Sequence, residues 1–134
     1  MIKVTFEAAL TIELRAIAAL NNRVYPLNAP EEPFDTSTPY LIFRTSEGLR
    51  TKDLDGYQSS KTVSGELNVV APTYAEMKSI TSSVIDTIIS FQSRIIGTGG
   101  PYIQNITYEE PVEMYEDKPK LYRCVIDFEV YFEQ

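Results

Sequence analysis

Two stretches of the chain place apolar residues three and four positions apart, which is the spacing of an amphipathic helix. In the first stretch, from about Phe6 to Asn21, the repeating apolar residues are Phe6, Leu10, Leu14 and Ile17. The second stretch runs from Thr73 to Phe91, and its apolar stripe consists of Met77, Ile80, Val84, Ile88 and Phe91. Thr73 and Glu76 form a capping box, in which hydroxyl and carboxylate satisfy the first free amides. The sequence therefore predicts two helices, each with one apolar face.

Four other segments alternate apolar and polar residues or form short apolar runs, as β-strands do. They are Tyr40–Thr45, Lys61–Ala71, Tyr102–Tyr108 and, approximately, Lys120–Phe132. In the last segment, one face is predicted to carry Tyr122, Cys124, Ile126, Phe128, Val130 and Phe132. Its charged residues fall on the opposite face, so we expect one side of this strand to line the core.

The remaining segments are rich in proline, glycine or charge, and we interpret them as connections. Val24–Pro39 contains several prolines, so we expect an extended link that is neither a helix nor a central strand. Residues 46–60 are predicted to form a long flexible polar loop, with a solvated hairpin tip as the alternative. Gly97–Pro101 has the composition of a turn. The acidic segment 109–117 is expected to be a loop broken by Pro111 and Pro119.

The predicted elements follow the order α-β-β-α-β-β. The simplest arrangement is an α/β fold of the α+β type, with a four-stranded, mostly antiparallel sheet and two helices on one face. The chain has 134 residues, which fits a single domain spanning 1–134. A domain of that size buries enough surface for one core, so neither a disulfide nor a metal is needed to stabilise it.

Composition narrows the classes of function. The net charge of −7 argues against nucleic-acid binding, because an acidic chain repels phosphate unless it has a local basic patch. Only Arg44, Arg50 and Lys52 approach such a patch. The single cysteine excludes an internal disulfide, which is typical of a reducing compartment. No apolar run approaches the roughly 20 residues that cross a bilayer, and Met1–Phe6 lacks a signal-peptide pattern, so we expect neither a membrane segment nor a leader.

Candidate chemistry is sparse. The chain contains no histidine, which removes the usual general base near neutral pH and the common zinc sites. Cys124 falls on the apolar face of the last strand, so we interpret it as a core residue and not as a nucleophile. The glycines at 97–100 lack the lysine of a phosphate-binding loop and lead into a strand. We therefore predict no enzymatic activity, no catalytic residues and no cofactor.

The acidic segment is the strongest candidate for metal chemistry. Its carboxylates are those of Glu109, Glu110, Glu113, Glu116 and Asp117. Glu116-Asp117-Lys118 has the form of the end of a metal-dependent nuclease site. Such a site needs carboxylates fixed on adjacent strands, whereas we expect this segment to be a loop. We favour a solvated acidic connection and predict no metal.

Protein binding is better supported than chemistry. The predicted loop 46–60 mixes charged residues with apolar ones that an exposed loop would leave in water, which is typical of a binding loop. Tyrosines near loops suit protein contacts because they commit a large ring at a small entropy cost. The residues that we predict at protein interfaces are Leu49, Arg50, Lys52, Leu54, Tyr57, Glu110, Glu113, Tyr115 and Glu116.

Several short motifs, taken in order, resemble one protein family. They are Asn22-Arg23-Val24-Tyr25-Pro26, Thr38-Pro39-Tyr40-Leu41-Ile42-Phe43, Leu67-Asn68-Val69-Val70-Ala71-Pro72 followed by Thr73-Tyr74-Ala75-Glu76, and Leu121-Tyr122-Arg123-Cys124-Val125-Ile126-Asp127-Phe128-Glu129-Val130. Their order and spacing, over roughly Leu10 to Phe132, are similar to those of the tail completion, or tail-to-head joining, proteins of long-tailed bacteriophages. The likeness does not reach residues 46–60 or the acidic segment.

The resemblance implies a small tail terminator that assembles as a ring of six subunits on the finished tail tube. The implied partners are further copies of the chain, the tail tube protein and the head completion (stopper) protein, while DNA passes through the ring without specific binding. The implied location is the tail–head junction of the virion, and the bacterial host cytoplasm during assembly. The alternatives are a small cytosolic carboxylate-dependent enzyme and a regulator that binds one host protein.

Overall fold

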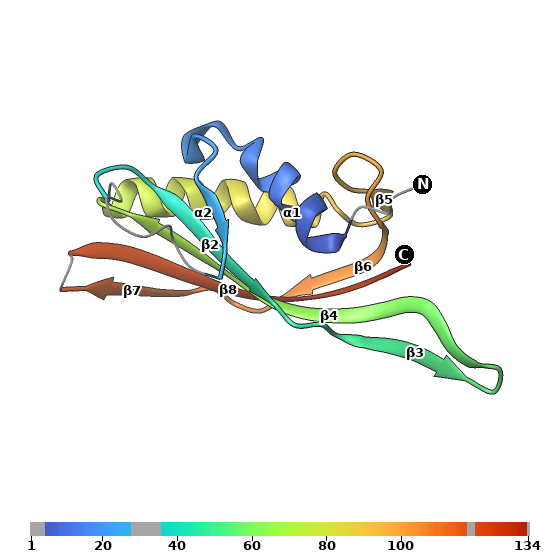
Figure 1. The fold of residues 1–134 in the computed structure, drawn as a ribbon. Coiled ribbons are helices and arrows are strands. Elements are labelled where there is room, and N and C mark those ends of the chain that lie inside the picture. The colour runs from blue at the N-terminus through green and yellow to red at the C-terminus, as the bar shows by residue number, and fades with distance from the viewer. Residues whose placement is uncertain (1–4, 28–35, 118–119, 134) are drawn as a thin grey trace.

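The computed structural model describes residues 5–27, 36–117 and 120–133, in which two α-helices lie over the same face of one eight-stranded sheet (Figure 1). The order of its helices and strands is α-β-β-β-β-α-β-β-β-β, with a short 3-10 turn after the first helix. The predicted four-stranded sheet with the order α-β-β-α-β-β is therefore wrong. Four strands lie outside the predicted strands, three of them in segments that were expected to be connections, and the sheet is mixed because one pair of strands is parallel.

Both helices begin where a threonine caps them. Helix α1 (Phe6–Arg15) follows Thr5, whose hydroxyl accepts a backbone N–H of the first turn at 3.2 Å. Helix α2 (Tyr74–Ile89) follows Thr73, which does the same at 3.2 Å, as the capping motif predicted. Each cap satisfies an amide that the helix itself leaves free. The apolar stripe predicted for α2 is buried against the sheet, with Met77, Ile80, Val84 and Ile88 all almost inaccessible.

Helix α1 ends at Arg15, earlier than the predicted boundary at Asn21. Ile17 is extended, a 3-10 turn covers Ala18–Leu20, and Asn21 takes a left-handed conformation with φ of 55°. Asparagine tolerates that conformation better than most residues because its side chain can bond to the local backbone. The break buries Leu20 and turns the chain back toward the sheet.

The centre of the sheet is a long antiparallel ladder between β4 (Gly56–Ala71) and β8 (Leu121–Glu133). Twelve residue pairs join these strands, from Ser60 opposite Glu133 to Ala71 opposite Tyr122. Two strands flank the ladder on each side. Along β4 lie β2 (Tyr40–Thr45) and then β3 (Leu49–Asp53). Along β8 lie β7 (Val112–Glu116) and then β6 (Tyr102–Tyr108).

The strands missing from the prediction are edge strands. Two are very short: β1 (Val24–Pro26) runs parallel to β2, and β5 (Arg94–Ile95) pairs with β6. The other two, β3 and β7, have no buried residue, so they lack the alternation that marks a half-buried strand. Backbone pairing to β4 and β8 places them in the sheet. Within the predicted link Val24–Pro39, residues 28–35 lie outside the described part of the chain.

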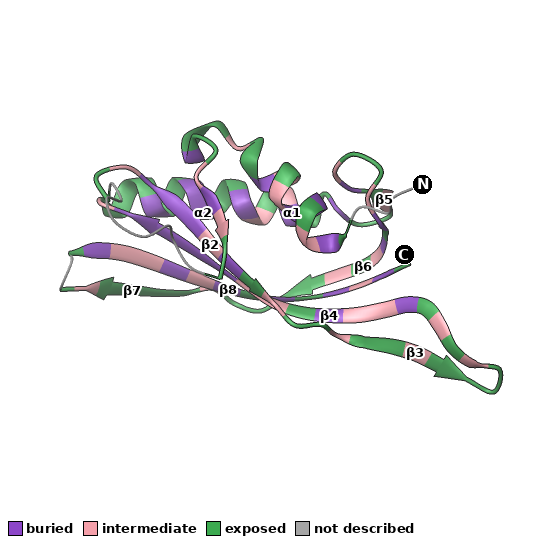
Figure 2. Cartoon of the chain, viewed as in Figure 1, coloured by how far each residue is buried: buried purple, intermediate pink, exposed green. Residues whose placement is uncertain are grey.

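The core lies between the helices and the inner face of the ladder (Figure 2). The predicted alternation of β8 is confirmed, since Cys124, Ile126, Phe128, Val130 and Phe132 are buried while Asp127 and Glu129 are exposed. Phe6 of α1 stacks on Phe132 with ring centroids 5.2 Å apart and also contacts Phe128 at 6.2 Å. Aromatic packing of this kind ties the first helix to the last strand.

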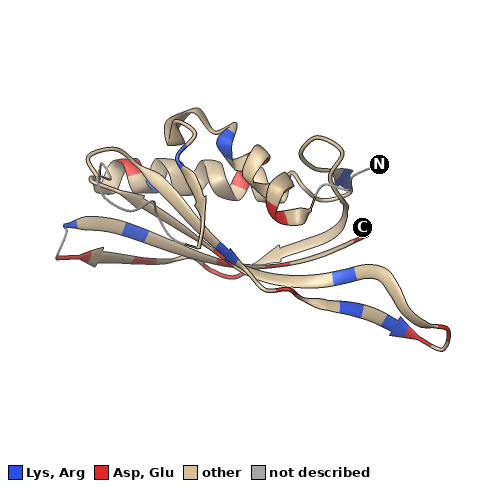
Figure 3. Ribbon diagram, viewed as in Figure 1, with Lys and Arg blue, Asp and Glu red and all other residues tan. Residues whose placement is uncertain are grey.

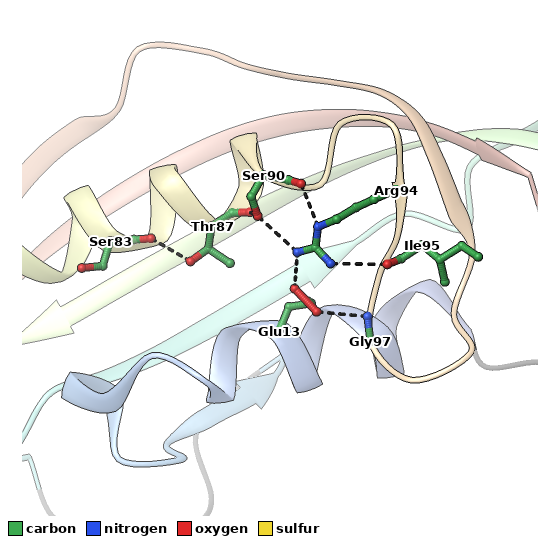
Figure 4. Close-up of polar contacts among 7 residues, drawn as sticks. All are labelled: Glu13, Ser83, Thr87, Ser90, Arg94, Ile95 and Gly97. Carbon is green, nitrogen blue, oxygen red and sulfur yellow. Dashed lines mark hydrogen bonds and ion pairs between the residues drawn. The ribbon is translucent and has the colours of Figure 1, made fainter.

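A partly buried ion pair joins α1 to the segment after α2 (Figure 4). Arg94 Nη2 donates to Glu13 Oε1 at 2.5 Å, and the backbone N–H of Gly97 donates to Glu13 Oε2 at 3.1 Å. Burial acts to raise the pKa of Glu13, but these hydrogen bonds and the Arg94 charge outweigh it and lower that pKa. Gly97 lies in the predicted turn, has φ of 62°, and would place a Cβ 2.8 Å from the Ala9 backbone, so glycine is required there.

Candidate functional site

Strand β3 and the outer end of β4 form a hairpin, Leu49–Ser59, whose tip projects beyond the rest of the sheet (Figure 1). Strand β4 continues through Gly56–Ser59 past its last pairing with β8. At the tip, Leu54 is 106% exposed and Tyr57 64%, and at the base of the hairpin Leu49 is 81% exposed. Large apolar side chains therefore lie in water on a part of the molecule that the helices do not cover (Figure 2).

The predicted long loop over residues 46–60 is corrected to this hairpin. A two-residue turn, Leu54-Asp55, joins the strands. Asp53 Oδ1 closes the turn by accepting the backbone N–H of Asp55 at 2.8 Å and Gln58 Nε2 at 2.9 Å. Asp53 thus holds both sides of the turn, which explains how a polar segment without buried residues keeps strand geometry.

The cations of the hairpin also make contacts within it. Arg50 Nε donates to the backbone carbonyl oxygen of Gln58 at 3.0 Å. Lys52 Nζ lies 5.2 Å from the centre of the Tyr57 ring, within the range of a cation–π contact. The register between the strands shifts between Arg50 and Lys52. These contacts order the hairpin while its apolar side chains stay exposed.

The acidic segment is also corrected, because Val112–Glu116 is strand β7 and not part of a loop. Glu113 Oε2 lies 2.7 Å from Lys78 Nζ on α2, and Tyr74 Oη donates to Glu113 Oε1 at 3.4 Å. The hydrogen bond to Glu113 raises the pKa of Lys78. Glu113 therefore connects β7 to α2 across the sheet end.

Two more of the predicted interface residues contact the chain's own β8. Glu116 accepts a hydrogen bond from Arg123 Nε, and Arg123 Nη1 donates to Asn68 Oδ1 at 3.0 Å. The Tyr115 ring packs on Tyr122 with centroids 4.8 Å apart. Of the four residues predicted in this segment, only Glu110 lies outside the strand. Glu113, Tyr115 and Glu116 support the position of β7 as well as lining its surface.

The structure does not bring the predicted interface residues together. The hairpin carries Leu49, Arg50, Lys52, Leu54 and Tyr57, whereas Glu110, Glu113, Tyr115 and Glu116 lie on or beside β7. The two groups are attached to opposite edges of the central ladder, since β3 pairs with β4 and β7 pairs with β8. Figure 1 places them at opposite ends of the sheet. One copy of the chain therefore offers two separate surfaces.

The hairpin carries no net charge, whereas the surface around β7 is acidic. On the hairpin, Arg50 and Lys52 balance Asp53 and Asp55, so the net charge of −7 resides on the rest of the chain. Figure 3 shows the cations of β3 beside the acidic turn, and acidic residues along β7. The hairpin is thus a neutral element on an acidic protein.

Sequence reasoning missed an apolar groove between the end of α2 and β6. It has a volume of about 360 Å³ and is lined by Ile88, Ile89, Gln92, Ile106, Thr107 and Tyr108. Ile89 is 49% exposed and Tyr108 42%. The signal was Ile89, an apolar residue that falls outside the buried stripe of its helix. The other wall comes from a distant strand, which no local pattern reveals.

The described residues hold no group of three or more histidine, cysteine, aspartate or glutamate side chains placed to bind a metal ion. Lys118, the last residue of the nuclease-like motif, lies outside them. Cys124 is buried, as predicted, and its burial raises the pKa of its thiol. Such a thiol is rarely ionised to the thiolate, which is the form that nucleophilic attack requires. Neither described helix is long and apolar enough to span a bilayer.

Comparison with known proteins finds the fold among solved structures. No protein-family model matches the chain. No curated protein sequence matches it either. One similar structure is a chain of the virion of a native gene transfer agent particle, with a TM-score of 0.71 and 17% identity over 96% of this chain and 95% of that one. A second solved chain, which carries no functional name, matches with a TM-score of 0.57 and 20% identity over 96% and 90% of the two chains.

Proposed function

We propose that this chain is a structural protein of a phage-like particle, and that it caps the finished tail tube as a ring and joins the tail to the head connector. The observation that carries the proposal is the likeness of the whole fold to a chain of a gene transfer agent virion. The sequence motifs, which resemble those of tail completion proteins, add the tail–head junction as the proposed position within such a particle.

The two surfaces of the chain support ring formation. A ring uses a heterologous contact, in which one surface of a subunit binds a different surface of its neighbour. The hairpin and the opposite edge of the sheet supply two such surfaces. Six subunits is the number implied by the sequence resemblance, and the tail tube protein and the head completion protein are the partners on the two faces of the ring.

The charge of the chain supports passage of DNA through the ring. With a net charge of −7, the subunits repel phosphate and would not hold the DNA as it moves. We place the protein at the tail–head junction of the virion, and in the host cytoplasm during assembly. We propose no catalytic role for it.

Disruption of the gene in a strain that produces the particle tests this function. Electron microscopy should then find tails of uncontrolled length and heads without tails, because nothing stops tube growth or bridges to the connector. Supplying the chain in trans should restore joined particles, and labelled antibody should mark the junction. Normal joined particles in the absence of the chain would refute the proposal.

A further inference from the structure

The groove between α2 and β6 leaves apolar surface in water. Ile89 and Tyr108 are both more than 40% exposed, and Ile106, which also lines the groove, is partly buried. The groove measures about 360 Å³. Since a cavity of about 150 Å³ holds benzene, this groove has room for a leucine side chain together with part of an aromatic ring. Covering it would remove apolar area from water, which is favourable.

Acidic side chains lie in the two hollows that adjoin this groove. Asp86 and Glu110 line the hollow toward β7. Glu109, Asp127 and Glu129 line the hollow that shares Thr107 and Tyr108 with the groove, and Asp127 and Glu129 lie on the face of the sheet that points away from the helices. All five are exposed. An occupant of the groove must therefore be apolar at its centre and must not bring net negative charge.

The hairpin of the same chain has this character. Leu54 and Tyr57 supply exposed apolar side chains at its tip, and Arg50 and Lys52 supply cations that balance its own carboxylates. Strand β4 runs through Gly56–Ser59 beyond its last pairing with β8, which gives the tip a reach of about 13 Å at roughly 3.3 Å per residue. In a protein of net charge −7, this neutral hairpin is an element that can approach a second copy without strong repulsion.

A chain cannot fill its own groove with its own hairpin. The hairpin is attached along the outer edge of β4, whereas β6 is attached along the outer edge of β8. Figure 1 shows the hairpin projecting away from both helices. The element and the groove that matches it therefore lie on opposite edges of one sheet, which is the arrangement that links identical subunits head to tail.

We propose that the hairpin of one copy seats in the α2–β6 groove of a second copy, with Leu54 against Ile89 and Tyr108. Arg50 and Lys52 then face the acidic borders of the groove. This contact rests on the proposed function, because it is the link between neighbouring subunits of the ring. It also assigns the hairpin to a contact between like subunits, and not to the tail tube or the head connector.

Crosslinking in assembled particles tests the contact. One copy carries Leu54→Cys and a coexpressed copy carries Ile89→Cys, and the native Cys124 is buried. A disulfide forms only when the two Cα atoms come within about 7 Å. Mild oxidation of purified particles should produce a disulfide-linked dimer on a non-reducing gel, and no larger species because each copy carries a single exposed thiol. The matched control pairs Leu54→Cys with Ile12→Cys on the exposed side of α1, and it should stay monomeric.

The outcomes separate this contact from the proposed function. If the chain is present at the tail–head junction but no disulfide links the two introduced thiols, the contact is wrong and the proposed function stands. If the wild-type chain is absent from particles, the proposed function fails and the contact fails with it. A disulfide equally strong in the Ile12→Cys control would reflect random collision and would also overturn the contact.

A second variant tests the contact without oxidation. Leu54→Glu places a charge where Leu54 would enter the apolar groove, and Leu54 makes no contribution to the core. The yield of joined particles should fall about tenfold or more, which is the effect of losing a central interface residue. Ile12→Glu, at a position 45% exposed, should leave the yield unchanged. An unchanged yield with Leu54→Glu would overturn the contact.

Discussion

The inner part of β4, Ser60–Ala71, and its outer end, Gly56–Ser59, belong to one continuous strand but lie in different surroundings. The inner part pairs with β8 along its whole length and includes the buried residues Val63, Leu67, Val69, Val70 and Ala71. The outer end has only β3 beside it and includes Tyr57, 64% exposed. The comparison shows that the two parts of the strand are stabilised by different interactions. Burial stabilises the inner part, whereas the outer end is held by backbone pairing and a closed turn, which leaves its side chains free for binding.

The largest expected effect lies in the inner region. Phe128 is 4% exposed and packs against Phe6, so Phe128→Ala should lower the free energy of unfolding by ~3–5 kcal/mol. Urea unfolding followed by circular dichroism measures the change. The control in the outer region is Tyr57→Ala, which should cost less than about 1 kcal/mol. A loss below about 1 kcal/mol for Phe128→Ala would mean that this ring is not part of the core.

A smaller effect is expected opposite the same ring. A Cβ on Gly65 would lie 2.5 Å from Phe128 Cζ and 2.9 Å from the Arg44 carbonyl oxygen. Gly65→Ala should therefore lower the free energy of unfolding by ~1–3 kcal/mol through overpacking. In a Phe128→Leu background the cost of Gly65→Ala should fall by about 1 kcal/mol, because the ring atoms are gone. Equal costs in both backgrounds would rule out the ring as the cause.

The ion pair of Glu13 is intermediate in burial between the two regions, since the Glu13 side chain is 18% exposed and that of Arg94 39%. The pKa of folded Glu13 is lowered from 4.5, so the ionised carboxylate stabilises the fold above that pH, and the stabilisation is lost as pH falls through the folded pKa. Glu13→Gln should cost about 1 kcal/mol at neutral pH, a modest value because Arg94 is partly solvated.

Urea unfolding at neutral pH and at progressively lower pH measures this effect, since the linkage is lost as pH falls through the folded pKa. The difference between wild type and Glu13→Gln should shrink as the pH falls. The exposed Glu109→Gln serves as the control and should show little difference at any of these pH values. A Glu13→Gln penalty that does not change with pH would show that the carboxylate charge is not what stabilises the contact.

Elements that bury a face were predictable from the sequence. The boundaries of Tyr40–Thr45 and Tyr102–Tyr108 agree with the structure, and the buried side of β8 was assigned correctly. In these segments the apolar positions repeat with the period of the element, so the pattern records which side is buried. Helix α2 was predicted for the same reason, together with its threonine cap.

Strands β3 and β7 could not be predicted in this way. Their side chains are not buried, so their residues show no alternation of apolar and polar positions that would mark a buried face. Their pairing depends instead on which strand lies beside them. The hairpin residues were identified as interface candidates because Leu49, Leu54 and Tyr57 are apolar in a polar segment. The α2–β6 groove was missed because its walls come from segments distant in sequence. The sequence therefore did not reveal which distant segments lie next to each other, either for the edge strands or for the groove.

The smallest expected effect on stability belongs to the hairpin tip. Leu54→Glu should change the free energy of unfolding by less than about 0.5 kcal/mol, because Leu54 is fully exposed in the free chain. Amide exchange should nevertheless separate the two regions of β4. Amides from Leu49 to Tyr57 should exchange by local opening, since no buried side chain opposes it, whereas those of Leu67–Val69 should require global unfolding.

Incorporation of the protein into particles should then change exchange across the hairpin from fast to slow, whereas the amides of Leu67–Val69, which are already slow in the free chain, should stay slow. The physical reason is that binding adds the burial that the hairpin lacks in the free chain, so opening must also break the contact with the neighbour. Hydrogen exchange read by mass spectrometry on free protein and on assembled particles makes the comparison directly. If the amides of Leu49–Tyr57 are as protected in the free chain as those of Leu67–Val69, the hairpin is rigid before assembly, and the contrast between the two parts of β4 does not extend to their dynamics.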